Sequence, residues 1–313
     1  MAGSAATPRP VVIGARGSAL SRAQAQRIQA RLEARFPDRP FAFEAVTTAG
    51  DCLPDAPLAS LGEGEGVFVK ELEAALLAGR IDVAVHSLKD LPLAMPEGLL
   101  LAAVPSREDA RDALISRGGR GLASLPEGAA VGTSSLRRRA QLLRLRPDLR
   151  MHDLRGNVDT RLRKLDEGPL EAIVLAAAGL HRLGLAARIT EYLDLAEVLP
   201  EPGQGALAVQ VRRDDADTLA IVLPLNDASA RACVEAERAF LGGLGGGCRV
   251  PIAAYAQLSG RQLVLEGIVV AADGSRHVRG HEQGPADDPQ AAGAALAKRL
   301  IAEGALALLN LTT

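Results

Sequence analysis

The first two thirds of the chain alternate short strand-like runs with amphipathic helical patterns. RPVVIGA predicts a strand, and the next segment, LSRAQAQRIQARLEARF, predicts a helix that ends before Pro37. The same order continues through FAFEAVTT, VFVKELEAALLAG and IDVAVHSL, and a second set runs from DALIS to EAIVLAA. Such alternation is typical of parallel α/β construction, so we expect two α/β halves, each with its own sheet, and a cleft between them.

The pattern changes after EPGQGALAVQVRR. DASARACVEAERAFL predicts a helix and GGLGGGC a glycine-rich turn; three strands with turns at Ser259-Gly260 and Asp273-Gly274 follow, then a helix from about Pro289 to Leu309. We therefore predict an α/β fold with two periplasmic-binding-protein-like α/β lobes around a cleft and a smaller C-terminal α+β domain. The expected domains are residues 1–104 with 203–224, residues 105–202, and residues 225–313.

Composition excludes several classes of protein. Hydrophobic residues make up 48% of the chain but aromatic residues only 2%, which disfavours binding of single-stranded nucleic acid by base stacking. The 36 basic and 38 acidic residues argue against a general polyanion-binding surface, so any basic site must be local. Cys52, Cys233 and Cys248 have no CxxC spacing, and we expect no metal site and a reducing cytoplasm. No signal-like run and no membrane-spanning stretch of about 18 apolar residues is found.

Polar side chains gather in four loops at the predicted strand ends, where open α/β sheets bind ligands. GARGSALS contributes Arg16 and Ser18, HSLKDLP contributes Ser87, Lys89 and Asp90, GTSSLRRR contributes Thr133, Ser134, Ser135, Arg137 and Arg138, and DLRGNVDTR contributes Arg155 and Arg161. Gly132, Thr133 and Ser134 at a helix N-terminus would offer N–H and hydroxyl groups to an anion, and arginines add bidentate forks for carboxylate or phosphate. The sequence therefore predicts a ligand that is anionic at several points.

Some charged residues are assigned other roles. We expect Arg139, Arg144 and Arg146 to be solvent-exposed on their helix. Asp90 lies beside Lys89 among many cations, which should lower its pKa and keep it ionised.

Cys248 has two interpretations. A lone cysteine is usually a small buried hydrophobic residue. The three glycines before Cys248, however, would leave room for a bulky group to approach the sulfur.

Five motifs carry a resemblance. HSLKDLP, VGTSSLRRRAQ, LRGNVDTRLRKLD, PGQGALAV and GGGCRVPIAAYA, in this order, closely resemble the hydroxymethylbilane synthase (porphobilinogen deaminase) family, from about Val11 to the C-terminal helix. Enzymes of this kind join four porphobilinogen molecules head to tail and release ammonia at each addition, and hydrolysis frees the linear tetrapyrrole hydroxymethylbilane. Porphobilinogen carries an acetate and a propionate arm, so the resemblance implies that the arginines bind carboxylates.

The resemblance also implies roles for single residues. Cys248 would hold a dipyrromethane cofactor through a thioether, and Asp90 would be catalytic. Cofactor-binding residues would be Cys248, Lys89, Asp90, Ser134, Arg137, Arg138 and Arg155; substrate-binding residues would be Arg16, Ser18, Ser87, Thr133, Arg155, Arg161 and, from the match GLHRLG, Arg182. We expect a cytoplasmic, monomeric transferase of tetrapyrrole and heme biosynthesis whose partner is its small-molecule substrate, with no nucleic-acid or membrane partner.

One loop departs from the family pattern. PLASLGEGEGVFVKE has Ser60 and, near Glu63 to Glu65, acidic or glycine residues where the family usually carries lysines. A role of this loop in binding carboxylates is therefore in doubt, and it would act only as a mobile lid.

Three rival functions remain open from the residues alone. A two-lobed solute receptor would explain the arginines but is normally exported and needs neither Asp90 nor an accessible Cys248. A phosphate-handling enzyme would use GTSS as a cradle, but the chain has no GxxxxGK[ST] motif. A nucleic-acid regulator is disfavoured by the net charge of -2 and the scarcity of aromatic residues.

Overall fold

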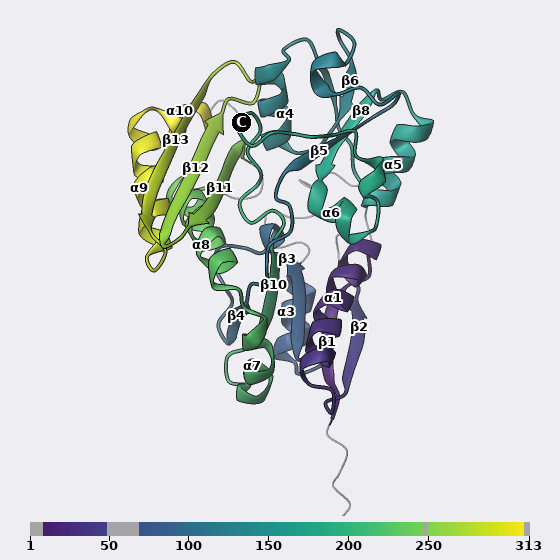
Figure 1. Cartoon of the computed structure of the whole chain (residues 1–313), viewed down its shortest axis with the longest axis vertical. Helices are drawn as coiled ribbons and strands as arrows, with labels where there is room; N and C mark the ends of the chain where they lie inside the picture. The colour runs from purple at the N-terminus through teal and green to yellow at the C-terminus, as the bar shows by residue number, and fades with distance from the viewer. Residues whose placement is uncertain (1–8, 49–68, 247–249, 310–313) are drawn as a thin grey trace, which may run out of the picture.

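The computed structural model describes residues 9–48, 69–246 and 250–309, and these residues form three sheets with helices packed around them (Figure 1). The first sheet has the order β2-β1-β3-β10-β4. Its strands are β1 (Val11–Arg16), β2 (Phe41–Val46), β3 (Val83–Ser87), β4 (Leu99–Ala103) and β10 (Leu207–Arg212), with helices α1 (Ala19–Arg35), α3 (Lys70–Leu77) and α7 (Ala216–Val222). Alternating buried residues such as Ile13, Val83 and Val209 form its core.

The second sheet has the order β7-β6-β8-β5-β9 and lies above the first in Figure 1. Its strands are β5 (Asp112–Ser116), β6 (Ala130–Gly132), β7 (Arg150–His152), β8 (Ala172–Ala176) and β9 (Glu191–Tyr192), with helices α4 (Leu136–Leu145), α5 (Val158–Glu167) and α6 (Ala177–Arg182). Because β10 follows this sheet in sequence but pairs with β3 and β4, the chain crosses between the two sheets twice.

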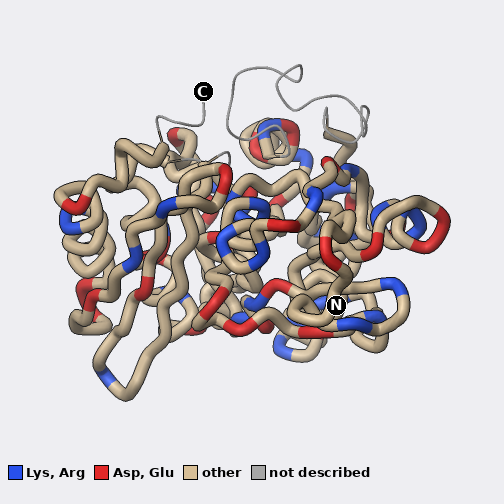
Figure 2. Tube along the Cα trace, turned by 90° about the horizontal axis from the view of Figure 1, so that it is seen from above, with Lys and Arg blue, Asp and Glu red and all other residues tan. Residues whose placement is uncertain are grey.

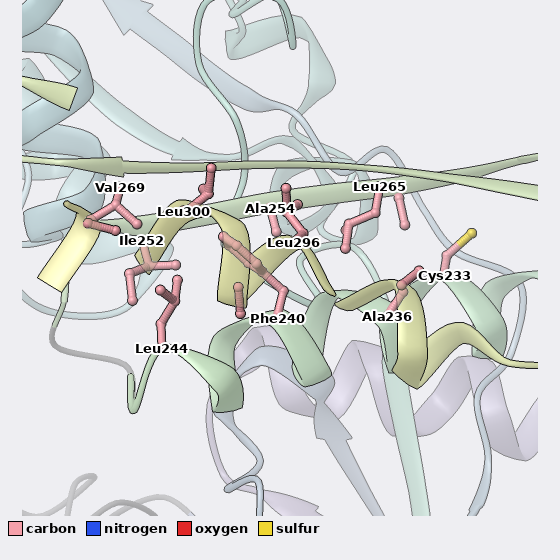
Figure 3. Packing of buried hydrophobic residues seen from close by; sticks show 14 of the residues in the cluster. Cys233, Ala236, Phe240, Leu244, Ile252, Ala254, Leu265, Val269, Leu296 and Leu300 are labelled. Atoms are coloured by element: carbon pink, nitrogen blue, oxygen red, sulfur yellow. The ribbon is translucent and has the colours of Figure 1, made fainter. Parts of the chain in front are cut away.

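The third sheet is a three-stranded antiparallel meander at the carboxyl end. It contains β11 (Ile252–Ser259), β12 (Gln262–Val270) and β13 (His277–Pro285), and packs with α8 (Ala228–Gly243), α9 (Pro289–Ala302) and α10 (Ala305–Leu309). Figure 3 shows Phe240 of α8 among Leu296, Leu300 and Ala254 in this core. A Cβ atom at Gly267 would lie 2.5 Å from Cζ of Phe240, so the ring needs a glycine opposite it.

The predicted fold class is confirmed: the structure has two α/β lobes and, in addition, a smaller α+β unit. The prediction of parallel sheets is wrong in part, because β10 runs antiparallel to β3 and β4, and β5 runs antiparallel to β8. The single helix predicted at the end is two helices, broken where Gly304 has a φ of 97°. The domain boundaries stay a prediction.

In the view of Figure 2, positive and negative positions are interspersed along the coloured part of the trace. Within the described part of the chain, none of the helices is both long and apolar enough to cross a membrane.

His86 is a buried titratable group in the centre of the first sheet. Its Nε2 lies 3.0 Å from Oε1 of Gln210, whose Nε2 donates to Glu73 at 3.0 Å. Burial lowers the pKa of His86 from 6.5 to about 4, although the bond to Gln210 opposes the change. His86 is therefore neutral in the folded protein near neutral pH.

We predict that His86 makes the fold acid-sensitive. His86 is protonated below about pH 6.5 in the unfolded chain but only below about pH 4 in the folded protein. The contribution of neutral His86 to the free energy of unfolding is therefore complete above pH 6.5 and is lost as the pH falls toward 4. The loss between pH 7 and pH 4 amounts to about 3 kcal/mol. Urea unfolding of wild type and His86→Gln at both pH values should show a smaller acid loss in the variant; equal losses would contradict the assignment.

Glu237 joins all three parts of the molecule. This α8 carboxylate is fully buried and accepts from Arg107 at 2.6 and 3.1 Å, in the connection between the first two sheets. It also accepts from the backbone N–H of Gly203 at 2.7 Å, in the connection back to the first sheet, and from that of Ala256 in β11 at 2.8 Å. Four hydrogen bonds compensate for the loss of water around the charge.

Removing this carboxylate should destabilise the fold. We expect Glu237→Ala to lower the free energy of unfolding by roughly 3–5 kcal/mol, because the partly buried Arg107 loses its counter-ion and the backbone N–H groups of Gly203 and Ala256 lose their acceptor. Glu235→Ala is the matched control: Glu235 is partly exposed on the same helix and pairs with Arg231 at 3.3 Å, so its loss should cost under about 1 kcal/mol. Similar losses in denaturant titrations of the two variants would show that Glu237 does not join the three parts.

Candidate active site

A cavity of about 320 Å³ lies between the first two sheets, at the strand ends. Its lining includes residues from the end of β1, the end of β3, the first turns of α1 and α5, α6, and residues 204–206. Eight of the residues predicted from the sequence line it: Arg16, Ser18, Ser87, Lys89, Asp90, Arg138, Arg161 and Arg182. Residues from the strand ends of both lobes therefore line one shared cavity.

The β1–α1 connection places Arg16 and Ser18 at the cavity. Arg16 is the last residue of β1, and Ser18 is the N-cap of α1, where its Oγ accepts from the N–H of Ser21 at 3.2 Å. From the next helical turns, Gln24 donates from Nε2 to Oγ of Ser87 at 2.9 Å, which ties α1 to the end of β3. The helix cap formed by Ser18 and the hydrogen bond between Gln24 and Ser87 therefore fix this wall of the cavity.

Lys89 and Asp90 occupy the short 3-10 helix Leu88–Asp90, directly after β3. Lys89 Nζ lies 3.3 Å from Oε2 of Glu201. Asp90 corrects the expectation of a lowered pKa: burial raises its pKa, Glu201 adds to this, and the charges of Lys89, Arg16 and Arg161 offset it only in part. A raised pKa makes Asp90 a better proton acceptor than an ordinary aspartate.

Arg137 and Arg138 share one buried counter-ion. Asp112, the first residue of β5, is fully buried; Arg137 Nη1 donates to its Oδ2 at 2.7 Å, and Arg138 donates to its Oδ1 from Nη2 at 2.8 Å and from Nε at 3.0 Å. Burial alone would raise the pKa of Asp112, but the two guanidinium charges outweigh it and hold the pKa well below its usual range. Both arginines are buried, and Arg138 also lines the cavity.

Three other arginines, in α4 and at its C-cap, contradict the expectation of solvent exposure. Arg139, Arg144 and Arg146 are all half-buried. Arg144 donates to the carbonyl of Glu197 at 2.6 Å, and Arg146 donates to the carbonyl of Leu122 at 2.8 Å. Neighbouring loops offer backbone acceptors that the helix pattern does not reveal.

Arg161 and Arg182 supply charge from the second lobe. Arg161 Nε donates to the carbonyl of Gly156 at 2.7 Å, and Arg182 Nη2 donates to the carbonyl of Gly205 at 2.6 Å. Burial lowers the pKa of each to about 10, so both remain cationic near neutral pH. The cavity therefore has five basic residues in its lining against the two carboxyl groups of Asp90 and Asp159.

Four predicted site residues are described by the structure but are not part of this lining: Thr133, Ser134, Arg137 and Arg155. The Ser134 hydroxyl donates to the carbonyl of Leu154 at 2.9 Å and accepts from its N–H at 3.0 Å. The N-cap of α4 is Ser135, whose own N–H donates to Thr133 Oγ1 at 3.2 Å. The hydroxyl groups of the predicted anion cradle thus stabilise the loop itself.

Polar residues at or beside the cavity that sequence reasoning did not assign to the site include Gln24, Asp112 and Gln204. Gln24 and Gln204 line the cavity, and Asp112 holds Arg138. Gln204 had a signal, since it stands between two glycines in PGQG. Asp112 had none, because nothing in the sequence shows that the first residue of DALIS lies next to Arg137 and Arg138.

Several predicted features lie outside the described residues: Cys248, Cys52, and most of the lysine-poor loop with Ser60 and Glu63 to Glu65. Cys233 is described; it is buried in α8, and burial together with the charge of Glu237 raises its pKa to about 11. Among residues 9–48, 69–246 and 250–309, no group of three or more His, Cys, Asp or Glu side chains could hold a metal ion.

Comparison with known proteins identifies the relatives of this chain. Residues 11–220 match the family model described as porphobilinogen deaminase, dipyromethane cofactor binding domain, and residues 231–302 match the model of the porphobilinogen deaminase C-terminal domain. Among solved structures, the periplasmic aliphatic sulphonate binding protein SsuA from Escherichia coli is 17% identical, with a TM-score of 0.40 over 75% of this chain and 70% of that one.

Two relatives cover almost the whole chain. The porphobilinogen deaminase of Roseiflexus sp. (strain RS-1) is 51% identical over 299 residues, which is 96% of this chain and 98% of the relative. That of Methylobacillus flagellatus is 50% identical over 298 residues, 95% of this chain and 96% of the relative. On the strength of both matched models and of this identity along nearly its full length, the chain belongs to the porphobilinogen deaminase family.

Proposed function

We infer that this chain is a transferase that joins four porphobilinogen molecules head to tail and releases ammonia and hydroxymethylbilane. Family membership along nearly the full chain supports this reaction. The single structural observation that carries it is the cavity between the lobes, where five basic residues surround Asp90. A polycarboxylate substrate needs the basic residues, and proton transfer during condensation needs a group such as Asp90.

The residues of the cavity fit a dipyrromethane cofactor. Such a group carries several carboxylate arms, and the excess of cations in the lining matches them in charge. Each charge-assisted hydrogen bond to a carboxylate contributes roughly 1.5–3 kcal/mol. We propose that Cys248 holds the group, that Lys89 and Arg138 bind its carboxylates from the cavity wall, and that Ser134, Arg137 and Arg155 support them. When bound, the group supplies the pyrrole carbon to which the first porphobilinogen is joined.

We assign Arg16, Ser18, Ser87, Thr133, Arg155, Arg161 and Arg182 to the substrate, with Thr133 and Arg155 acting from outside the cavity lining. Arg161 and Arg182 are anchored to backbone carbonyls, so little side-chain freedom remains to be lost when a carboxylate binds. Arg16 faces them from the first lobe, across the same cavity. Carboxylate arms that reach both sides would hold the pyrrole ring near Asp90.

Asp90 is the proposed catalytic residue. At each addition the bond between the aminomethyl carbon and nitrogen breaks, a carbon–carbon bond forms to the free pyrrole carbon of the partner, and that carbon loses a proton while ammonia leaves. The ionised Asp90 carboxylate accepts pyrrole N–H bonds and stabilises the positive charge that develops as nitrogen departs. Its raised pKa also suits it to take up the proton and pass it to ammonia.

We propose a monomer in the cytoplasm, with a first lobe of residues 1–104 and 203–224, a second of residues 105–202, and a domain of residues 225–313 that carries the cofactor cysteine. The order of strands in the three sheets supports this division.

The cofactor assignment predicts a covalent mass addition. Protein purified from cells that make porphobilinogen should carry two pyrrole units by intact mass spectrometry, and Cys248→Ser should lack them because serine is a much poorer nucleophile. Cys233→Ser is the matched control and should keep the addition, since Cys233 is buried and its raised pKa leaves little thiolate. An unmodified wild type, or an addition lost with Cys233, would refute the assignment.

The role of Asp90 predicts both a rate and a pH dependence. We expect Asp90→Asn to lower kcat on the order of 10²–10⁴-fold without loss of folded structure, whereas Asp159→Asn, in the same lining, should retain most activity. Because the pKa of Asp90 is raised above 3.8 and the ionised form is active, kcat/KM should fall with acid at a pH above that value. Porphobilinogen consumption from pH 4 to 9 measures both, and an unchanged rate in Asp90→Asn would exclude this role.

A further inference from the structure

The segment around Gln204 is held closely between the two lobes. Gly203 and Gly205 have φ values of 78° and 86°, which favour glycine. A Cβ atom at Gly203 would lie 2.4 Å from Cδ2 of Leu88, and one at Gly205 would lie 2.4 Å from the carbonyl oxygen of Glu108. The two glycines thus allow the backbone to pass between the 3-10 helix of the first lobe and the connection to the second, with Gln204 fully buried.

The side-chain amide of Gln204 is in contact with both lobes. Nε2 donates to the carbonyl of Ala110 and to Oδ1 of Asp112, each at 2.8 Å. Oε1 accepts from Nζ of Lys89 at 3.3 Å and from Nη2 of Arg138 at 3.4 Å. Because both N–H donors face acceptors and the oxygen faces two cations, the orientation of the amide is fixed.

We propose that Gln204 is a positioning residue whose amide oxygen holds Lys89 of the first lobe and Arg138 of the second at a fixed separation in the cavity wall, beside Asp90. This inference rests on the proposed function. It concerns a residue that acts through its neighbours and takes no part in bond making.

The proposal follows from the charges around the amide. Lys89 and Arg138 repel each other, and the oxygen between them is a neutral acceptor that both can use. An apolar side chain would leave both cations without this acceptor. A side chain too short to reach Asp112 and Ala110 would leave Oδ1 of Asp112 and the carbonyl of Ala110 without the amide N–H donors of Gln204.

Displacement of Lys89 has a consequence at Asp90. Of the positive charges that lower the pKa of Asp90, that of Lys89 has the largest effect. Lys89 has a second partner in Glu201 at 3.3 Å, toward which it can turn when Gln204 is replaced. Loss of the amide should therefore raise the pKa of Asp90 further and reduce the fraction of ionised enzyme at mildly acidic pH.

The test compares Gln204→Met with Gln141→Met in the cofactor-loaded enzyme. Gln141 is the matched control, since it is also a fully buried glutamine and bonds to the backbone N–H and carbonyl of Leu199 at 2.9 Å, but it does not belong to the described cavity lining. For Gln204→Met we expect kcat to fall about 10–100-fold and the acid limb of kcat/KM to move to higher pH. For Gln141→Met we expect a lower stability with wild-type kcat and an unchanged acid limb.

Intact mass measured on each variant confirms that the dipyrromethane is attached before rates are compared. Equal kcat and equal acid limbs in Gln204→Met and Gln141→Met would overturn the proposal. If Gln204→Met does not fold, Gln204→Asn replaces it, because its shorter amide cannot bridge the two cations; wild-type kinetics in that variant would likewise overturn it. A wild-type enzyme that does not consume porphobilinogen would instead refute the proposed function.

Discussion

Asp112 is the charge on which the architecture of the cavity depends. Two guanidinium groups from consecutive residues are buried beside it, and without a carboxylate at this position they would repel each other in a region from which water is excluded. Because Asp112 is the first residue of β5 and both arginines lie in the first turn of α4, the ion pairs also fix the helix against the sheet. The two ion pairs of Asp112 therefore hold this part of the cavity wall in place.

Hydrogen bonds from three parts of the molecule meet in the short connection that returns from the second lobe to the first. Gly203 donates to Glu237, the carbonyl of Gln204 accepts from Arg107, and the carbonyl of Gly205 accepts from Arg182. A movement of the C-terminal unit relative to the lobes would have to break at least one of these bonds. The connection is therefore the place where the position of the unit expected to carry the cofactor is linked to the side chains that would receive it.

Part of the cavity lining could be predicted from the sequence, because polar side chains at the ends of strands in an open α/β sheet lie at one edge of that sheet. Arg16, Lys89 and Arg161 come from these loops and line the cavity, while their roles in binding stay a prediction. The pKa of Asp90 could not be predicted, since neighbouring cations are visible in the sequence but burial is not, and burial has the larger effect. Asp112 was missed for a related reason: it faces Arg138 only because β5 lies next to β8 in the folded sheet. The antiparallel directions of β5 and β10 were not predicted, because the alternation of strands and helices along the sequence does not specify strand direction.

The position of β10 has a consequence for the order in which the molecule is made. This strand lies in the interior of the first sheet, between β3 and β4, yet it leaves the ribosome only after the entire second sheet has been synthesised. Until Leu207–Arg212 emerges, β3 and β4 lack their shared neighbour, so the amino-terminal lobe cannot complete its backbone hydrogen bonding. The strands of the second lobe are contiguous in the chain, so all of them are available before β10 has been synthesised.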